Sequence, residues 1–398
     1  MANRAGPTLR SRTVEPDTVH DERSRQDFVT AFRAHLAARL TPGNQAAYQR
    51  RALPRFEREQ GRRPADFHEV RAAMRGDSYY QFWSALQRRS QELMWESVLE
   101  PIERQLPSLI SRASALARKA RQHLGSGGSL QLDPAFEVPR YHTAADIHLQ
   151  PGGYHTDFTD NDIAAGAIYD GGLKIYLQGA AGSANASMGE LLVGFLRARR
   201  AGFEPRRILD MGCGIGNSTL PWVRAFPQAE VHAIDVAAPL LRYGHARAES
   251  MGAAVQFSQQ NAERTVFADG SFDLVVSHIM LHETSRSALP RIVAECHRLL
   301  RPGGLMLHLE IPRGSTPFQQ FMYNWEVWNN NETFAVHMTG LDLAGLAVAG
   351  GFEPGAVEAV DYAAQRSPEQ RLYSDDVCWK VLVARREEPA RRQGGFRA

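Results

Sequence analysis

The sequence has 398 residues, in which 46 Lys and Arg are nearly balanced by 44 Asp and Glu to give a net charge of +2. This length exceeds one typical domain, so we expect a core domain with a substantial additional region. Balanced charge, without a dense basic block and interleaved aromatics, argues against a nucleic-acid partner. Because no apolar run approaches the roughly 20 residues of a membrane span, and the first residues lack the apolar core of a signal peptide, we expect a cytoplasmic protein with no membrane partner.

The composition also limits redox and metal chemistry. Cys213, Cys296 and Cys378 are too few and too scattered for a disulfide framework or a cysteine-based zinc site. Only three of the 46 basic residues are lysines. We interpret this preference for arginine as the mark of a GC-rich, bacterial genome.

The first third of the chain predicts a helical domain. Residues 1–24 are polar and charged, which is typical of a flexible start. Within residues 25–129, apolar side chains recur at helical spacing, and the region ends in a Gly/Ser linker at residues 125–129. We expect this domain to cap an active site or to form a homodimer surface, because amphipathic helices need a partner surface.

Prolines and polar residues indicate where these helices begin and end. Thr41-Pro42-Gly43 is expected to stop the first helix, and Pro101 with Pro107 to break the apolar pattern of a later one. Asp66 and the pair Asp77-Ser78 are candidate N-caps.

Residues 130–187 predict an irregular connector, since prolines and paired glycines are spaced through its first half. It carries several histidines, among them His142, His148 and His155, and a second concentrated stretch at residues 167–176. This connector is expected either to fold over the active site as a lid or to wrap the surface.

A strand, a glycine loop and a helix start come next. The apolar run Ile208–Met211 predicts a buried strand, and three glycines at alternate positions, Gly212, Gly214 and Gly216, open the turn that follows. Backbone N–H groups and the next helix N-terminus can then lie against a polar, nucleotide-like ligand. The carboxylate of Asp210 would repel a pyrophosphate but suits a ligand with an ammonium group.

From residue 208 onward, strand-like and helix-like runs alternate, which indicates an α/β fold with a parallel sheet and crossover helices. Ligands of such sheets bind beyond the carboxyl ends of the strands. The seven expected strands lie at residues 208–211, 231–235, 255–260, 272–278, 305–311, 355–362 and 377–385.

The glycine loop and the strand ends that follow it resemble the motifs of class I S-adenosylmethionine (SAM) dependent methyltransferases. The resemblance includes Asp235 after the second strand, the fourth strand at 272–278 and the Pro-Gly-Gly turn that ends at Gly304. It implies a Rossmann-like, seven-stranded methyltransferase sheet with helices on both faces, within a domain at residues 188–390 that has an aromatic-rich insertion at 313–350.

The resemblance also implies SAM as the cofactor and assigns the residues that would bind it. Asp235 would accept from the ribose hydroxyls, and Asn261 would face the adenine amine. The implied cofactor residues are Asp210, Gly212, Gly214, Gly216, Asn217, Asp235, Val236, Asn261, Ala262, Ser277 and His278.

Methyl transfer is an in-line displacement at an activated sulfonium methyl, so positioning does most of the work. A base is needed only if the acceptor must lose a proton. The candidate catalytic residues are His282, Glu283, Glu310 and His155. The candidate substrate contacts are Tyr169, Tyr176, Tyr323, Trp325 and Trp328.

A metal site is conceivable because His278 and His282 stand four residues apart, with His308 and Glu310 expected across the pocket mouth. This spacing is common by chance, and we expect no metal.

We therefore expect methyl transfer from SAM to a small organic acceptor, with O, N and C all open as the acceptor atom. The core motifs are similar to those of quinone-biosynthesis C-methyltransferases, but the long helical N-terminal region departs from their compact form. A methyltransferase of specialised-metabolite biosynthesis fits better. Two alternatives remain: a SAM-fold enzyme with a reaction other than methyl transfer, and a non-catalytic SAM-fold scaffold or regulator.

Overall fold

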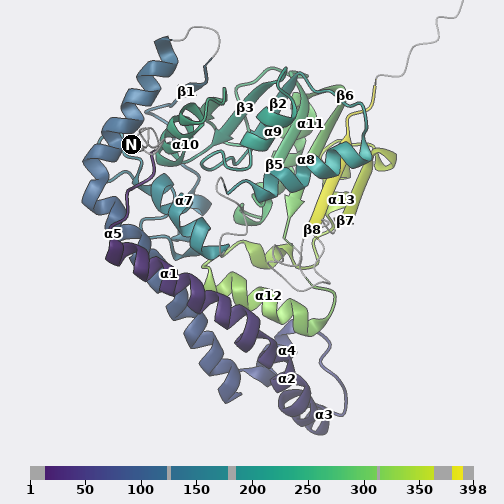
Figure 1. Ribbon diagram of the computed structural model, residues 1–398. Helices are drawn as coiled ribbons and strands as arrows, with labels where there is room; N and C mark the ends of the chain where they lie inside the picture. The colour runs from purple at the N-terminus through teal and green to yellow at the C-terminus, as the bar shows by residue number, and fades with distance from the viewer. Residues whose placement is uncertain (1–13, 123–126, 178–184, 312–313, 363–378, 389–398) are drawn as a thin grey trace, which may run out of the picture.

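The computed structural model describes residues 14–122, 127–177, 185–311, 314–362 and 379–388. At its centre lies an eight-stranded sheet with the order β1-β4-β3-β2-β5-β6-β8-β7 (Figure 1). The expected α/β fold is confirmed, and β1, which begins in the expected linker, adds one strand to the seven predicted. The strands are β1 (Ser129–Gln131), β2 (Arg207–Met211), β3 (Glu230–Asp235), β4 (Gln256–Gln259), β5 (Phe272–His278), β6 (Leu300–Glu310), β7 (Val357–Tyr362) and β8 (Trp379–Arg385).

The order of the strands determines where a ligand can bind to the sheet. β3 and β5 both pair with β2 in parallel, one on each side, so the chain changes direction across the sheet at β2 and β5. A crevice opens beyond the carboxyl ends of the strands at such a switch point. β8 joins the far side of β6 as an antiparallel strand, and β7 pairs with β8 in the same sense.

Helices cover both faces of the sheet because side chains alternate along each strand. Ile208 of β2 packs with α8 (Ser187–Arg199) and α9 (Leu220–Ala225). The adjacent Leu209 packs on the opposite face with α11 (Leu289–Leu299) and α13 (Leu343–Ala349). The three-layer core therefore follows from period-two patterning in the strands.

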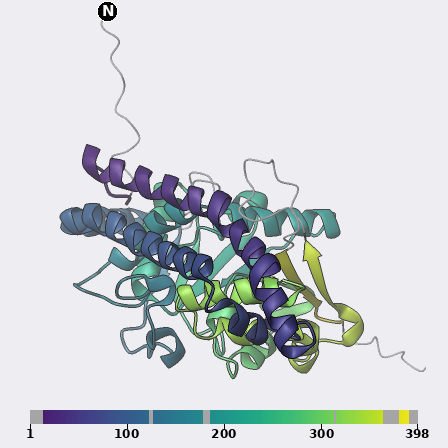
Figure 2. The ribbon, with the colours of Figure 1, turned by 90° about the horizontal axis from the view of Figure 1, so that it is seen from below.

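Two long helices dominate the N-terminal domain. α1 (His20–His35) lies alongside α5 (Ser78–Gln122), as the two views show (Figures 1 and 2). Arg104 of α5 donates to both oxygens of the buried Glu22, at 2.9 and 2.7 Å. These hydrogen bonds lower the pKa of Glu22. Although α5 is long, none of the helices in the described ranges combines the length and apolar character that crossing a bilayer requires.

The predicted break at Pro101 and Pro107 is wrong, because both residues lie inside α5, a single helix of 45 residues. Pro101 has no N–H to offer the carbonyl one turn earlier. That carbonyl, on Ser97, accepts a hydrogen bond from Nε2 of Gln26 on α1 at 3.0 Å. A neighbouring helix thus replaces the donor that the proline lacks.

The predicted stop at Thr41-Pro42-Gly43 is also wrong. Helical structure continues without a gap, and Pro42 lies in the first turn of its helix, where a missing N–H costs little. The run ends only at Gly61, whose φ of 68° is left-handed. After α1 it comprises the π-helical segments η2 (Leu36–Leu40) and η3 (Tyr48–Ala52), with α2 (Thr41–Ala47) and α3 (Leu53–Gln60).

The expected caps are present. Oδ1 of Asp66 accepts from the backbone of His68 and Glu69 at the start of α4 (Phe67–Met74), at 2.9 and 3.0 Å. Asp77 accepts from the backbone N–H of Tyr79 at 3.0 Å and so caps α5.

Helix α12 (Pro317–Asn329) joins the N-terminal domain to the sheet domain (Figure 1). Trp325 packs against Trp83 with ring centroids 4.1 Å apart, and its Nε1 donates to Oγ of Ser84 at 2.8 Å. Phe321 lies in a core cluster with Met74 of α4. The aromatic-rich insertion is therefore part of the interface with the N-terminal helices.

The connector is less irregular than expected. It holds α6 (Arg140–Thr143), the 3-10 turn η4 (Ile147–Leu149) and a full helix, α7 (Ala164–Tyr176). Gly172 of α7 lies so close to Trp95 of α5 that a Cβ there would be 2.3 Å from the indole ring. Glycine at this position permits α5 and α7 to pack closely. This packing buries the second half of the connector, which contains α7.

Candidate active site

The glycine loop turns sharply at the end of β2. Gly212, Gly214 and Gly216 have φ values of 67°, 54° and 72°, a region that favours glycine. A Cβ at Gly212 would lie 2.3 Å from Cγ of Met280, whereas a Cβ at Gly214 would meet nothing within 4 Å. The backbone at Gly214 thus presents an open face that a ligand can approach.

Asp210 precedes the glycine loop, and two side chains hold its carboxylate in place. Its Oδ2 accepts from Oγ1 of Thr219 at 2.6 Å, and its Oδ1 lies 3.3 Å from Nδ1 of His278. Nε1 of Trp222 lies 3.3 Å from Nε2 of the same imidazole. Because an indole N–H only donates, Nε2 of His278 accepts and Nδ1 carries the proton toward Asp210. His278 therefore orients Asp210 through its Nδ1.

Asp235 ends β3 beside this loop. Its Oδ2 accepts from the backbone N–H of Gly214 at 2.8 Å, and its Oδ1 accepts from that of Ala237 at 2.9 Å. Burial raises the pKa of Asp235, and the two backbone donors oppose the shift. Asn261, after β4, accepts from the N–H of Glu263 at 2.9 Å through its Oδ1.

A histidine–carboxylate pair lies after β5, in the 3-10 turn η5 (Leu281–Glu283). Nδ1 of His282 is 2.9 Å from Oε2 of Glu310, whose Oε1 accepts from the N–H of Leu281 at 2.8 Å. Burial alone would lower the pKa of His282, but the Glu310 carboxylate outweighs burial and raises that pKa to about 9. The imidazole is therefore protonated at neutral pH.

A second histidine lies between two carboxylates. Nε2 of His148 is 3.5 Å from Oε1 of Glu283 and 3.4 Å from Oε1 of Glu332. Burial opposes the charge on His148, yet both carboxylates together raise its pKa. For Glu283, burial raises the pKa and the imidazolium of His148 more than offsets it, so the net shift is downward.

One cavity, with a volume of about 170 Å³, connects the glycine loop with His148, His282 and Glu283. Asp235, Gly216, Val236, Asn261 and Ala262 are not among its described lining residues. Its cofactor end contains Asp210, Gly212, Gly214, Asn217 and His278. Its other end is built from α5, the connector with α7, η5, α12 with two residues after it, and the start of β8. The side chains that line this end include Met94, Trp95, His148, Tyr154, Tyr169, Tyr176, His282, Glu283, Tyr323, Glu326, Asn330, Glu332 and Trp379.

Comparisons with known proteins agree with this geometry. Residues 208–304 match a family model described as a methyltransferase domain. The chain carries a class I SAM-dependent methyltransferase domain. SAM is the cofactor of this domain class, so the expected family and cofactor are both confirmed.

The sequence similarity to two curated relatives covers 27% of this chain in each case. A malonyl-[acyl-carrier protein] O-methyltransferase of Methylococcus capsulatus is 39% identical over 109 residues, which is 27% of this chain and 38% of that protein. A demethylmenaquinone methyltransferase of Thermus thermophilus is 35% identical over 108 residues, 27% of this chain and 48% of its own length. This chain thus spans less than half of either relative.

Among solved structures, phosphoethanolamine N-methyltransferase 2 of Haemonchus contortus in complex with SAM gives a TM-score of 0.41. It is 17% identical in sequence and covers 55% of this chain and 57% of that one.

The methyltransferase domain has the chemistry that SAM needs. The open face at Gly214 gives backbone access, Asp210 offers a carboxylate to an ammonium group, and Asp235 is a buried carboxylate with backbone partners only. A carboxylate with four lone-pair directions and two backbone donors can still accept from two hydroxyls.

Not every predicted residue reaches the cavity. Ser277 is fully buried, with Oγ 2.5 Å from Nδ1 of His308. His155 lies in the connector beside His142, with ring centroids 5.9 Å apart, and is absent from the described lining. Trp325 packs on α5, and Trp328 is 52% exposed. Glu310 is buried behind His282.

Several lining residues carry no signal in the sequence. Glu326 and Glu332 look like surface carboxylates of a helix and a polar loop, and Trp95 looks like helix core. Only the fold brings them within reach of a glycine loop more than 100 residues away in the chain. His148 was visible as a connector histidine, but without a partner.

Among the described residues, no group of three or more His, Cys, Asp or Glu side chains is arranged to hold a metal ion. His308, expected at the pocket mouth, is fully buried in the sheet, and this burial lowers its pKa to about 4.

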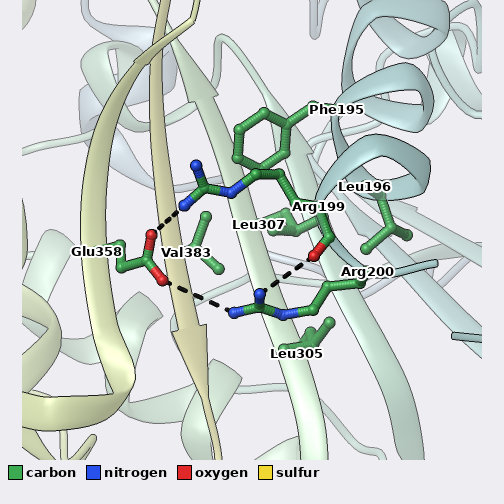
Figure 3. Close-up of a pocket in the computed structure, with 8 residues that line it drawn as sticks. All are labelled: Phe195, Leu196, Arg199, Arg200, Leu305, Leu307, Glu358 and Val383. Atoms are coloured by element: carbon green, nitrogen blue, oxygen red, sulfur yellow. Dashed lines mark hydrogen bonds and ion pairs between the residues drawn. The ribbon is translucent and has the colours of Figure 1, made fainter.

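A second, much smaller hollow lies between α8 and the sheet (Figure 3). Arg199, the last residue of α8, and Arg200, which follows it, both pair with Glu358 of β7 there. Leu305 and Leu307, which line it, lie in β6 on the side away from Glu310. Its lining is apolar or already ion-paired, so this hollow fixes α8 on the sheet and offers no reactive group.

Proposed function

We propose that this protein transfers the methyl group of SAM to a small organic acceptor held in the cavity. The observation that supports this most is continuity: one cavity runs from the glycine loop at Gly212 and Gly214 to an enclosed polar and aromatic chamber. A cofactor bound at the loop and an acceptor in the chamber would share that space. The cofactor supplies an activated methyl group, and the chain holds the acceptor in line with it.

Asp210, Gly212, Gly214, Gly216, Asn217 and Asp235 are the residues we propose to hold SAM, together with Val236, Asn261, Ala262 and His278. Asn261 would serve the adenine only after its amide turns from Glu263, to which it now bonds. Ser277 would act indirectly, because its hydroxyl bonds to His308 in the core.

Glu283 is the base we favour, for an acceptor that must lose a proton. It lines the cavity and its lowered pKa keeps it ionised. His282 is protonated at neutral pH through Glu310 and so is suited to donate a hydrogen bond rather than to remove a proton. His155 has the weakest support, since it lies outside the lining.

The helical region at residues 25–129 serves in this proposal as a cap, the connector at 130–187 as a lid, and residues 188–390 as the methyltransferase domain. Met94 and Trp95 of α5 support the cap role, because they line the cavity. We further propose a cytoplasmic protein that acts in small-molecule biosynthesis and a homodimer formed through the N-terminal helices. The exposed Phe28 and Phe82, 62% and 59% accessible, support that surface.

The test is stoichiometric. Purified protein would be mixed with SAM and fractionated extracts of the producing cells, and S-adenosylhomocysteine would be quantified together with any product that gains one methyl group. Equal amounts of both are expected. S-adenosylhomocysteine binding without any methylated product would favour the non-methyl-transfer alternative, and no binding of SAM by calorimetry would favour the scaffold.

A further inference from the structure

The chamber that would receive the acceptor carries an excess of negative charge. Three carboxylates, Glu283, Glu326 and Glu332, line it, against the imidazoles of His148 and His282. Among the described residues of the lining, none is a lysine or an arginine. Even with both imidazoles protonated, the three carboxylates exceed the cations of the described lining by one, and His282 is already paired with a fourth carboxylate, that of Glu310. Arg33 is a nearby cation outside that lining: its guanidinium lies over the Tyr176 ring, 4.8 Å from the centroid, and its charge opposes the rise that burial causes in the pKa of Glu326.

Two carboxylates of the lining, those of the buried Glu332 and the half-buried Glu326, each have one oxygen that accepts a hydrogen bond from the described residues. Oε1 of Glu332 accepts from Nδ2 of Asn330 at 3.1 Å, and Oε1 of Glu326 accepts from the hydroxyl of Tyr176 at 2.8 Å. The Oε2 atoms of Glu326 and Glu332 accept no hydrogen bond from the described residues. In the lining of a cavity, such carboxylate oxygens are free to accept from a donor on a ligand.

These two carboxylates also repel each other. Burial raises the pKa of Glu326, the Tyr176 hydroxyl opposes the shift, and the charge of Glu332 adds to it. A cation bound between them would relieve both the burial and the repulsion.

Aromatic rings surround the same place. The ring of His148 lies 6.5 Å from that of Tyr154 and 6.2 Å from that of Tyr176, and Tyr154 meets Tyr169 edge to face at 5.5 Å. The faces and hydroxyls of tyrosines attract ammonium groups. Carboxylates within an aromatic wall form a site for an organic cation.

We propose that the methyl acceptor is an organic amine, bound as its ammonium ion against Glu326 and Glu332, so that the protein is an N-methyltransferase. This inference rests on the proposed methyl transfer and goes further by naming the acceptor atom. An anionic acceptor would have to be buried beside three carboxylates with no lysine or arginine in the described lining to balance it.

The reaction balances with SAM as the only co-reactant. The bound ammonium first gives one N–H proton to the carboxylate of Glu283, which frees the nitrogen lone pair. That pair forms the new N–C bond to the methyl carbon while the C–S bond breaks and its electron pair remains on sulfur. The product leaves as a methylated ammonium with S-adenosylhomocysteine, and the proton on Glu283 passes to solvent.

The experiment compares ligands of the same shape and opposite charge. Primary arylalkylamines, such as phenethylamine, and their isosteric carboxylates, such as 3-phenylpropanoate, would be titrated by calorimetry into full-length protein saturated with S-adenosylhomocysteine. We expect at least one amine to bind about tenfold or more tightly than its isostere. Equal or tighter binding of every carboxylate, or no binding of any amine, would overturn the proposal.

Charge-neutral variants localise the effect. Glu332→Gln and Glu326→Gln should each weaken amine binding by about tenfold, while the exposed Glu103→Gln on α5 should not change it. Amine affinity that survives in both chamber variants would contradict the site. Unchanged S-adenosylhomocysteine affinity and thermal unfolding would show that the variants are folded.

The experiments distinguish failure of the proposed methyl transfer from failure of the assignment of nitrogen as the acceptor atom. Loss of S-adenosylhomocysteine binding by the wild-type protein would remove the proposed function itself. Normal S-adenosylhomocysteine binding without amine preference would remove only the assignment of nitrogen.

Discussion

Nε2 of Gln91, on the N-terminal helix α5, donates a hydrogen bond to the backbone carbonyl of His148 in the connector, 2.7 Å away. The same nitrogen lies 2.9 Å from Oδ1 of Asn330, and Oε1 of Gln91 accepts from Nδ2 of Asn329 at 2.9 Å. One buried glutamine therefore links the cap, the connector and the end of α12. His148 itself has a left-handed φ of 56°, so the connector depends on outside support at this point.

Gln91→Leu should loosen the acceptor chamber without affecting the cofactor loop. It removes the Gln91 partner of Nδ2 of Asn329 and of Oδ1 of Asn330, which should lower the free energy of unfolding by about 2 kcal/mol. We expect a KM for the acceptor at least about tenfold higher and an unchanged Kd for S-adenosylhomocysteine. Urea unfolding and calorimetry measure both, with the exposed Gln81→Leu on the same helix as the control. If the Kd for S-adenosylhomocysteine rises together with the KM, the hydrogen bonds of Gln91 support the whole domain and not the chamber alone.

Asp235→Ala should weaken SAM binding by about 1.5 to 3 kcal/mol, through loss of charge-assisted hydrogen bonds. Calorimetry with SAM is the measurement, and the exposed Asp160→Ala is the matched control. An unchanged affinity would mean that the ribose lies elsewhere.

Two glycine variants should separate folding from binding. An alanine Cβ at Gly212 would meet Met280 at 2.3 Å, whereas at Gly214 it would point into open space. Both substitutions strain a positive φ. Gly212→Ala should therefore lower the melting temperature more, and Gly214→Ala should lose more SAM affinity relative to its loss of stability. Thermal unfolding gives the loss of stability of each variant, and calorimetry gives its loss of SAM affinity. If Gly212→Ala lost more affinity relative to stability than Gly214→Ala, Gly214 would not face the ligand.

The His282–Glu310 pair should make stability depend on alkaline pH. The pKa of His282 rises from 6.5 to about 9 on folding, so its stabilisation is complete below the unfolded pKa and is lost as pH rises through the folded one. Between pH 6.5 and pH 10 the wild type should lose about 3 kcal/mol more than His282→Gln. Urea unfolding at several pH values tests this. Parallel curves for the two proteins would show that the imidazole is neutral in the folded state. The pKa of His148 is also raised on folding, but His148 is present in both the wild type and His282→Gln, so its contribution cancels in the comparison.

The cofactor half of the site was accessible from sequence because its residues follow strands one after another. Asp210, Gly214 and Asp235 each lie at or within three residues of the carboxyl end of an apolar run, and parallel strands bring such positions to one edge. Local spacing is enough for that inference.

The acceptor half could not be predicted in this way. Glu326 and Glu332 point into the chamber only because α12 packs on α5, and α5 passes through Pro101 only because Gln26 of another helix supplies a hydrogen bond. Both facts depend on contacts between distant segments. Local proline rules therefore predicted breaks that tertiary packing removes.

Under the proposed function, α5, the connector with α7, and α12 would together shape the acceptor's binding site, and the interface between α12 and α5 couples two of these segments. Trp325 donates to Ser84 and packs at a tilt against Trp83, while Met94 and Trp95 on the same α5 form part of the chamber wall. A relative with a different helical region would place a different wall against the same cofactor loop. Exchanging residues 78–122 together with 317–332 is then the smallest graft that would move specificity as a unit, and exchanging either segment alone would leave a mismatched interface.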